Sequence, residues 1–137
     1  MKWEVSLPEA GDIIRVKHRF YYHYGIYIDD DTVVQFGLSE DAVHNAADVR
    51  VLCDGIHTFT ASGEVERACL TLSEKAKSRS RDKICEYALS CIGEGDYNIL
   101  HNNCEHFVYR CVFGESSAPG LDSVRAGIRK LLKKDRE

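Results

Sequence analysis

The segment HYGIYIDDDTVVQF, residues 23–36, constrains the fold most, because it has the pattern of a β-hairpin. β-branched and aromatic residues fill both arms, and the acidic triplet at residues 29–31 favours a tight turn between them. The arms of a hairpin pair antiparallel, so the pattern places His23 and Gln35 on paired strands. We therefore expect an antiparallel sheet that carries both of these polar side chains.

Further strands and two helices are expected around the hairpin. GDIIRVKHRF, residues 11–20, predicts a strand that starts at a Gly-Asp turn, and weaker strand patterns cover VRVLC at 49–53 and VERACLTL at 65–72. Ser73 is the expected N-cap of an amphipathic helix that stops at Gly93, and Asn102 or Asn103 is the expected N-cap of a later helix. These elements predict an α+β protein with a small antiparallel sheet packed against helices.

The length of 137 residues and the hydrophobic content of 44% fit one domain with one core. We expect this core over about residues 7–113, followed by a linker, GESSAPG, at 114–120. A last amphipathic helix is predicted over 121–134. Its basic residues and apolar stripe fit docking on the domain or a weak, salt-sensitive contact with a membrane surface.

Charge and cysteine content restrict the partners and the compartment. The formal net charge is −4 and no basic field precedes the last dozen residues, which argues against nucleic acid as a partner. The first residues have no apolar signal-peptide core, and no run approaches the about 18 apolar residues of a membrane span. We therefore expect a cytoplasmic protein with reduced cysteines, most of them small buried hydrophobes. This expectation covers Cys53, Cys69, Cys85 and Cys91.

The segment HNNCEHFVYRC, residues 101–111, places one cysteine in a different setting. Cys104 falls at the expected start of a helix, where unpaired N–H groups and the helix dipole lower the pKa of a thiol. A nucleophilic cysteine also needs a base. His106 lies two positions away on the same helix and points to another face, whereas His23 heads an alternating strand and is the best-placed of six histidines.

A metal site is the rival interpretation of this segment. His101, Cys104 and His106 form an H-x2-C-x-H cluster, but the chain has no second cluster at the spacing that zinc sites use. We expect no metal and no other cofactor.

Three segments, PEAGDIIRV, HYGIYIDDDTVVQFG and NNCEHFV, resemble the lecithin:retinol acyltransferase-like family. Members of that family are similar to a circularly permuted form of NlpC-type papain-like peptidases. The resemblance covers residues 1–40 and about 78–112, and the NNCEHFV block is its most specific part. It implies a papain-like fold in which the sheet packs against the helix of Cys104.

The resemblance also implies roles for single residues. Cys104 would be the nucleophile and His23 the general base. Gln35 stands where family members often carry a second histidine, and its carbonyl can still orient the imidazole. The backbone N–H of Cys104 is an expected oxyanion donor, and Asn103 and Tyr22 are candidate supporting residues.

The implied activity is that of a cysteine-dependent acyltransferase or phospholipase A-like hydrolase, which works on a lipid or other acyl ester through an acyl-thioester on Cys104. Two alternatives stay open. The first is an amidase or peptidase of the same fold, and the second is a non-catalytic binding module in which Gln35 marks a weakened site.

Overall fold

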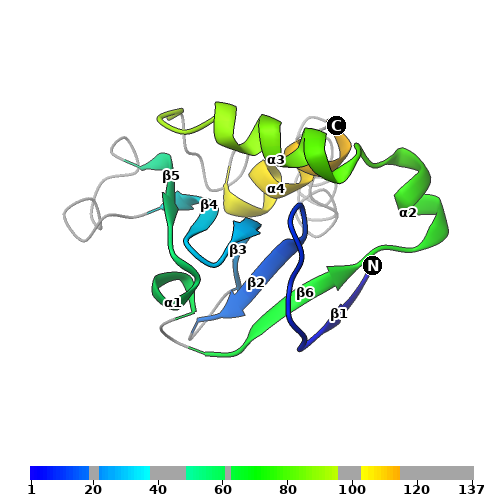
Figure 1. The fold of residues 1–137 in the computed structure, drawn as a ribbon, viewed down its shortest axis with the longest axis horizontal. Helices are drawn as coiled ribbons and strands as arrows, with labels where there is room; N and C mark the ends of the chain where they lie inside the picture. Colours follow the sequence, from blue (N-terminus) through cyan, green and yellow to red (C-terminus); the bar gives the residue numbers. More distant parts are fainter. Residues whose placement is uncertain (19–21, 38–48, 61–62, 96–102, 115–137) are drawn as a thin grey trace, which may run out of the picture.

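A six-stranded sheet forms the core of the described chain (Figure 1). The structure is a computed structural model and describes residues 1–18, 22–37, 49–60, 63–95 and 103–114. All neighbouring strands are antiparallel, in the order β1-β6-β2-β3-β4-β5. Their bounds are Lys2–Glu4 (β1), Ile13–Lys17 (β2), Tyr22–Asp29 (β3), Thr32–Gly37 (β4), Arg50–Asp54 (β5) and Val65–Cys69 (β6).

Four helices accompany the sheet within the described ranges. They are α1 (Ile56–Phe59), α2 (Leu72–Lys77), α3 (Arg81–Ser90) and α4 (Cys104–Phe113). Figure 1 shows α3 and α4 side by side along one face of the sheet, whereas the short α1 follows β5. This arrangement confirms the predicted α+β class with an antiparallel sheet packed against helices.

The two faces of the sheet carry separate hydrophobic clusters, because alternate residues of a strand point to opposite sides. On the α4 face, strand residues such as Ile26 and Val34 pack with Phe107 and Val108 of α4. On the opposite face, which we call the α1 face, Val33 and three further buried residues form a smaller cluster. Those three are Ile14, Val16 and Phe59.

The predicted hairpin is confirmed, with a register shift between Tyr27 and Asp29 next to the acidic turn. The strand patterns at β2 and β5 are also confirmed, although β2 ends at Lys17. The third pattern, at 65–72, is only partly right, because β6 ends at Cys69 and α2 begins at Leu72. Two elements were not predicted: the edge strand β1 and the single-turn helix α1.

The single helix expected from Ser73 to Gly93 is wrong. Thr71, not Ser73, caps the first helix, since its side chain accepts from the N–H of Glu74 at 3.1 Å while the Glu74 carboxylate accepts from the N–H of Thr71. A second start follows at Ser80, whose hydroxyl caps α3. Extended backbone at Ser78 separates the two helices.

The burial expected of the cysteines is partly wrong. Cys91 is buried, but Cys53 is exposed because it lies on a strand near the edge of the sheet. Cys69 and Cys85 are intermediate, and all six cysteines are free. No helix within the described residues is both long and apolar enough to cross a bilayer. The expected final helix at 121–134 and nearly all of the expected linker at 114–120 lie outside the described residues.

Candidate active site

Cys104 is the first residue of α4, as predicted, and its position is fixed by the cap of that helix. The Asn103 side chain accepts a hydrogen bond from the N–H of His106 at 3.0 Å. In return, Nδ1 of His106 accepts from the N–H of Asn103 at 3.4 Å. His106 is fully buried, and its ring completes the capping box at the start of the helix.

The thiol of Cys104 meets β3 at Tyr24, whose backbone hydrogen-bonds the sulfur. On the edge of β3 that faces β2, the N–H of Tyr27 donates to the carbonyl of Asp12 at 3.0 Å. Backbone groups alternate between the two edges of a strand, so the N–H of Tyr24 points the other way, toward β4. Cys104 therefore approaches β3 from the β4 side.

Along this edge, the pairing of β3 with β4 stops early within the described residues. The β3–β4 pairs run from Asp29–Thr32 to Ile26–Val34, whereas the pairing of β3 with β2 continues as far as Tyr22. At Tyr24, beyond the last of these pairs, the backbone of β3 bonds the thiol of Cys104 at the start of α4. The end of the ladder thus brings a helix N-terminus against the strand that carries His23.

His23 is joined to Gln35 by a hydrogen bond between Nε2 of the imidazole and Oε1 of the amide. The amide nitrogen of Gln35 donates to Oδ2 of Asp54 at 3.2 Å. Gln35 is only 5% exposed, so the middle of this chain of three side chains is buried, whereas His23 and Asp54 are partly exposed. An ionised carboxylate can only accept, and this orients the amide oxygen of Gln35 toward His23.

That orientation fixes the tautomer of His23. Because the Gln35 oxygen accepts from Nε2, Nε2 carries the proton and Nδ1 keeps a free lone pair. Asp54 was not among the predicted site residues, and it follows directly after the strand expected at 49–53. The signal was the register: Gln35 pairs with Leu52, which sets Asp54 diagonally beside it on the same face.

The imidazole of His23 lies on the α1 face, with its ring 5.2 Å from the ring of Phe59. Gly25, two residues along the same face, leaves room for this packing. A Cβ at that position would lie 2.9 Å from Cε2 of Phe59 and 2.9 Å from Cγ1 of Val33. Burial lowers the pKa of His23 below its ordinary 6.5; the hydrogen bond to Gln35 opposes this, and His18 adds to it.

Cys104 packs with the cluster on the α4 face, whereas His23 lies on the α1 face. The two expected catalytic side chains therefore lie on opposite faces of β3. The structure joins His23 to Gln35 and Cys104 to Tyr24. Among the described residues no hydrogen bond joins His23 to Cys104.

The pKa of Cys104 departs from the expectation drawn from its helix position. Burial raises the pKa of the thiol above its ordinary value, and the charge of Glu105 adds to the rise. Backbone hydrogen bonds, first that of Tyr24, lower the pKa but do not outweigh burial. The expected net lowering by the helix N-terminus is therefore wrong in sign.

Of the two candidate supporting residues, Asn103 is the N-cap described above, and Tyr22 belongs to a stack on the α4 face. The guanidinium of Arg15 lies 3.9 Å from the Tyr22 ring centroid and 4.1 Å from that of Trp3. Tyr22 is therefore held in place on the face from which Cys104 approaches.

A six-stranded antiparallel sheet with helices against it is consistent with the fold class shared by lecithin:retinol acyltransferase-like and NlpC-like proteins. The family model described as lecithin retinol acyltransferase matches residues 6–117. The chain therefore belongs to the lecithin retinol acyltransferase family.

Curated relatives agree with this assignment. Lecithin retinol acyltransferase of Bos taurus is 26% identical over 156 aligned residues, which cover 98% of this chain and 67% of the relative. Phospholipase A and acyltransferase 2 of Homo sapiens is 29% identical over 118 residues, which cover 80% of this chain and 73% of the relative. Such relatives support an enzyme function of the acyltransferase or phospholipase type in the family.

Proposed function

We propose that this protein is a cysteine-dependent acyltransferase or phospholipase A-like hydrolase that takes an acyl group from a lipid ester onto Cys104. The observation that carries the proposal is the chain His23–Gln35–Asp54, which ends beside the strand backbone that binds the Cys104 thiol. Thiol acyl transfer requires an oriented imidazole that can reach a cysteine thiol, and the structure supplies the oriented imidazole and a cysteine at a helix start. Family membership supports the same class of reaction.

The proposed first step starts from a neutral thiol and a neutral imidazole. Nδ1 of His23 takes the proton of Cys104 while the sulfur attacks the ester carbonyl. The C–O bond then breaks, the alcohol leaves with the proton from His23, and an acyl-thioester remains. Water or another acceptor gives its proton to His23 and attacks the thioester, which restores the free thiol.

This step requires the imidazole to reach the sulfur past the end of the β3–β4 pairing at Ile26, the side on which Cys104 binds Tyr24. The N–H of Cys104 is the proposed oxyanion donor, because the first N–H groups of a helix have no partner within the helix. Tyr22 on the same face is the proposed supporting side chain.

The substrate class rests on the relatives. Those named lecithin retinol acyltransferase and phospholipase A and acyltransferase make a phospholipid or similar acyl ester the proposed donor. A peripheral membrane contact through residues 121–134, a cytoplasmic location and the single-domain organisation stay predictions from the sequence.

The experiment that tests the proposal traps the acyl-enzyme. After incubation with a phospholipid, mass spectrometry should find one acyl group on the peptide of Cys104 and none on that of Cys85, a half-buried cysteine that serves as internal control. His23→Ala should abolish acylation, because no base then takes the proton. Equal acylation in wild type and His23→Ala would contradict the proposed role of His23.

The same experiment separates the alternatives. An acyl group transferred to Cys104 from peptide or amide substrates but not from esters would favour the amidase. A Cys104 that forms no adduct with any acyl donor and reacts with thiol probes no faster than Cys85 would favour the binding module.

A further inference from the structure

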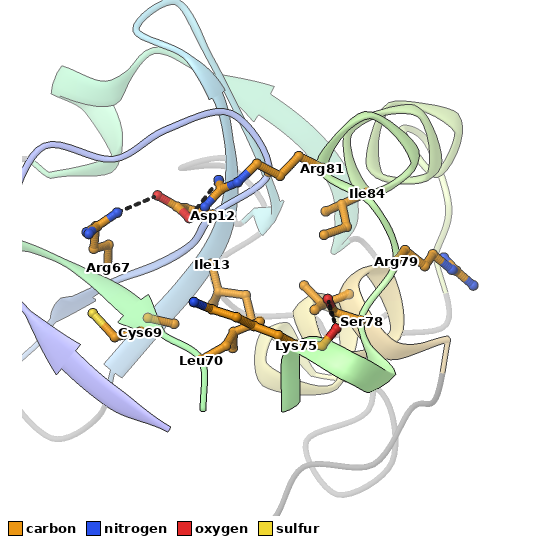
Figure 2. A pocket seen from close by; sticks show the side chains of 13 residues that line it. Asp12, Ile13, Arg67, Cys69, Leu70, Lys75, Ser78, Arg79, Arg81 and Ile84 are labelled. Atoms are coloured by element: carbon orange, nitrogen blue, oxygen red, sulfur yellow. Dashed lines mark hydrogen bonds and ion pairs between the residues drawn. The ribbon is translucent and has the colours of Figure 1, made fainter. Parts of the chain in front are cut away.

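A pocket of about 360 Å³ lies at the end of α4 that is remote from Cys104 (Figure 2). Its walls come from the start of β2, the end of β6, the α2–α3 junction and Val112 of α4. Val112 is eight residues after Cys104, which corresponds to roughly 12 Å along the helix. The pocket is therefore separate from the site of acyl transfer.

The lining of this pocket is strongly cationic although the whole chain is acidic. Four cationic side chains line it and only one acidic one, Asp12. The cations are Arg67, Lys75, Arg79 and Arg81.

Asp12 forms ion pairs with two of the four cations. It is 6% exposed and lies between two guanidiniums, with Nη1 of Arg81 at 2.9 Å and Nη1 of Arg67 at 3.6 Å. Figure 2 shows both arginines directed at this carboxylate from opposite sides. Outside the lining, Glu4 lies 3.6 Å from Arg67 and Glu9 lies 3.8 Å from Arg81, so both arginines have further acidic partners.

Two donors on residues that line the pocket have no acceptor within the part of the chain that the structure describes. Lys75 forms no ion pair within the described residues, and Figure 2 shows its side chain extending across the pocket toward Ile13 and Leu70. Nε of Arg67 is buried and has no hydrogen-bond partner among the described residues. A buried donor without a partner destabilises the protein, so an acceptor supplied by a ligand would be bound favourably.

The remaining cation lies at the rim. Nη1 of Arg79 donates to the carbonyl of Cys111 at 3.3 Å, and its guanidinium lies 4.3 Å from the ring centroid of Tyr87. Neither contact neutralises its positive charge. Arg79 therefore adds to the attraction of an anion without needing to touch it.

We propose that this pocket binds a phosphate-bearing anion, either a small phosphorylated compound or the phosphate of a lipid headgroup. Guanidinium and ammonium groups are the usual protein partners of phosphate, because they combine positive charge with several donors. The volume is at the lower end of the range for ligand pockets, about 300–1,000 Å³, which suits a small anion. The proposal does not depend on the chemistry of Cys104.

The test measures the binding of inorganic phosphate by isothermal titration calorimetry at constant ionic strength. Lys75→Gln should weaken binding about tenfold, since it removes a charge-assisted hydrogen bond. Lys77→Gln is the matched control: it removes the same charge from α2, but Lys77 does not line the pocket. Its affinity should stay within about twofold of wild type, because a remote exposed charge contributes little.

A second arm identifies the source of the phosphate. The same three proteins are mixed with vesicles of diether phosphatidylcholine, with and without diether phosphatidic acid, lipids that have no ester to cleave. Binding that needs phosphatidic acid and Lys75 would assign a headgroup, whereas Lys75-dependent binding of free phosphate alone would assign a small phosphorylated compound. Absence of saturable binding in both arms, or equal losses in Lys75→Gln and Lys77→Gln, would overturn the proposal.

Discussion

Gln35 has two chemically different ends, and Asp54 decides which of them faces His23. An amide can present either its oxygen or its nitrogen to an imidazole, and each choice selects a different tautomer of the ring. The carboxylate of Asp54 binds the nitrogen at 3.2 Å, so the oxygen is left for Nε2 of His23. A neutral glutamine backed by an acid can thus orient the base.

We predict that Asp54→Ala lowers kcat about tenfold with little change in KM, because the Gln35 amide can then rotate and oppose the active tautomer. Asp54→Asn should recover part of the rate, since its carbonyl can still accept from Gln35. Asp31→Ala, an exposed acid of the hairpin turn, serves as the control and should keep the wild-type rate. Steady-state kinetics of ester hydrolysis checks all three, and an unchanged kcat in Asp54→Ala would remove Asp54 from the site.

The pH dependence of kcat/KM follows from the two pKa shifts. Burial lowers the pKa of His23, so the base is neutral at pH 6.5 and becomes protonated only at lower pH. Activity should therefore be lost on acidification with an apparent pKa below 6.5 and be level at neutral pH. Because the pKa of Cys104 is raised, a mechanism with a preformed thiolate would instead gain rate steadily as the pH rises above 7. A pH–rate profile distinguishes the two, and continued growth through the alkaline range would contradict proton transfer to His23.

At the scale of the elements, the local patterns were sufficient for the hairpin and for α4. Alternating β-branched residues on either side of an acidic turn specify β3 and β4 within one short segment. The cap of α4 is equally local, since Asn103 and His106 lie three residues apart. His23, Gln35 and Cys104 could be assigned to their elements from the sequence because they lie in such segments.

Elements that depend on distant parts of the chain could not be found in this way. β1 exists because it pairs with β6, where Lys2 lies opposite Cys69, and its own sequence carries little strand signal. The break between α2 and α3 has a local cause, two capping residues at Thr71 and Ser80, but the apolar spacing ran across it. Asp54 was missed because it depends on a distant part of the chain: its contact with Gln35 follows from the register of β4 and β5.

For the whole molecule, the candidate site lies across the sheet. The larger cluster, on the α4 face, holds the helix that starts with Cys104, whereas the smaller cluster on the α1 face holds His23 against Phe59. The β3–β4 pairs that join the two strands stop at Ile26–Val34, before His23 and Tyr24. Packing on either face contributes to stability, and packing on the α1 face also positions His23, the proposed base, against Phe59.

This division predicts that two core truncations separate stability from catalysis. Phe59→Leu and Val108→Ala each remove buried apolar volume, on the α1 face and the α4 face, and each should lower the free energy of unfolding by about 1–3 kcal/mol. Phe59→Leu should also reduce kcat several-fold, because the imidazole loses the ring that it packs against at 5.2 Å. Val108→Ala, measured well below its melting temperature, should keep kcat close to wild type. Denaturant unfolding and kinetics on the same samples provide the check. Equal losses of kcat in the two variants would show that the α1 face has no special part in holding His23.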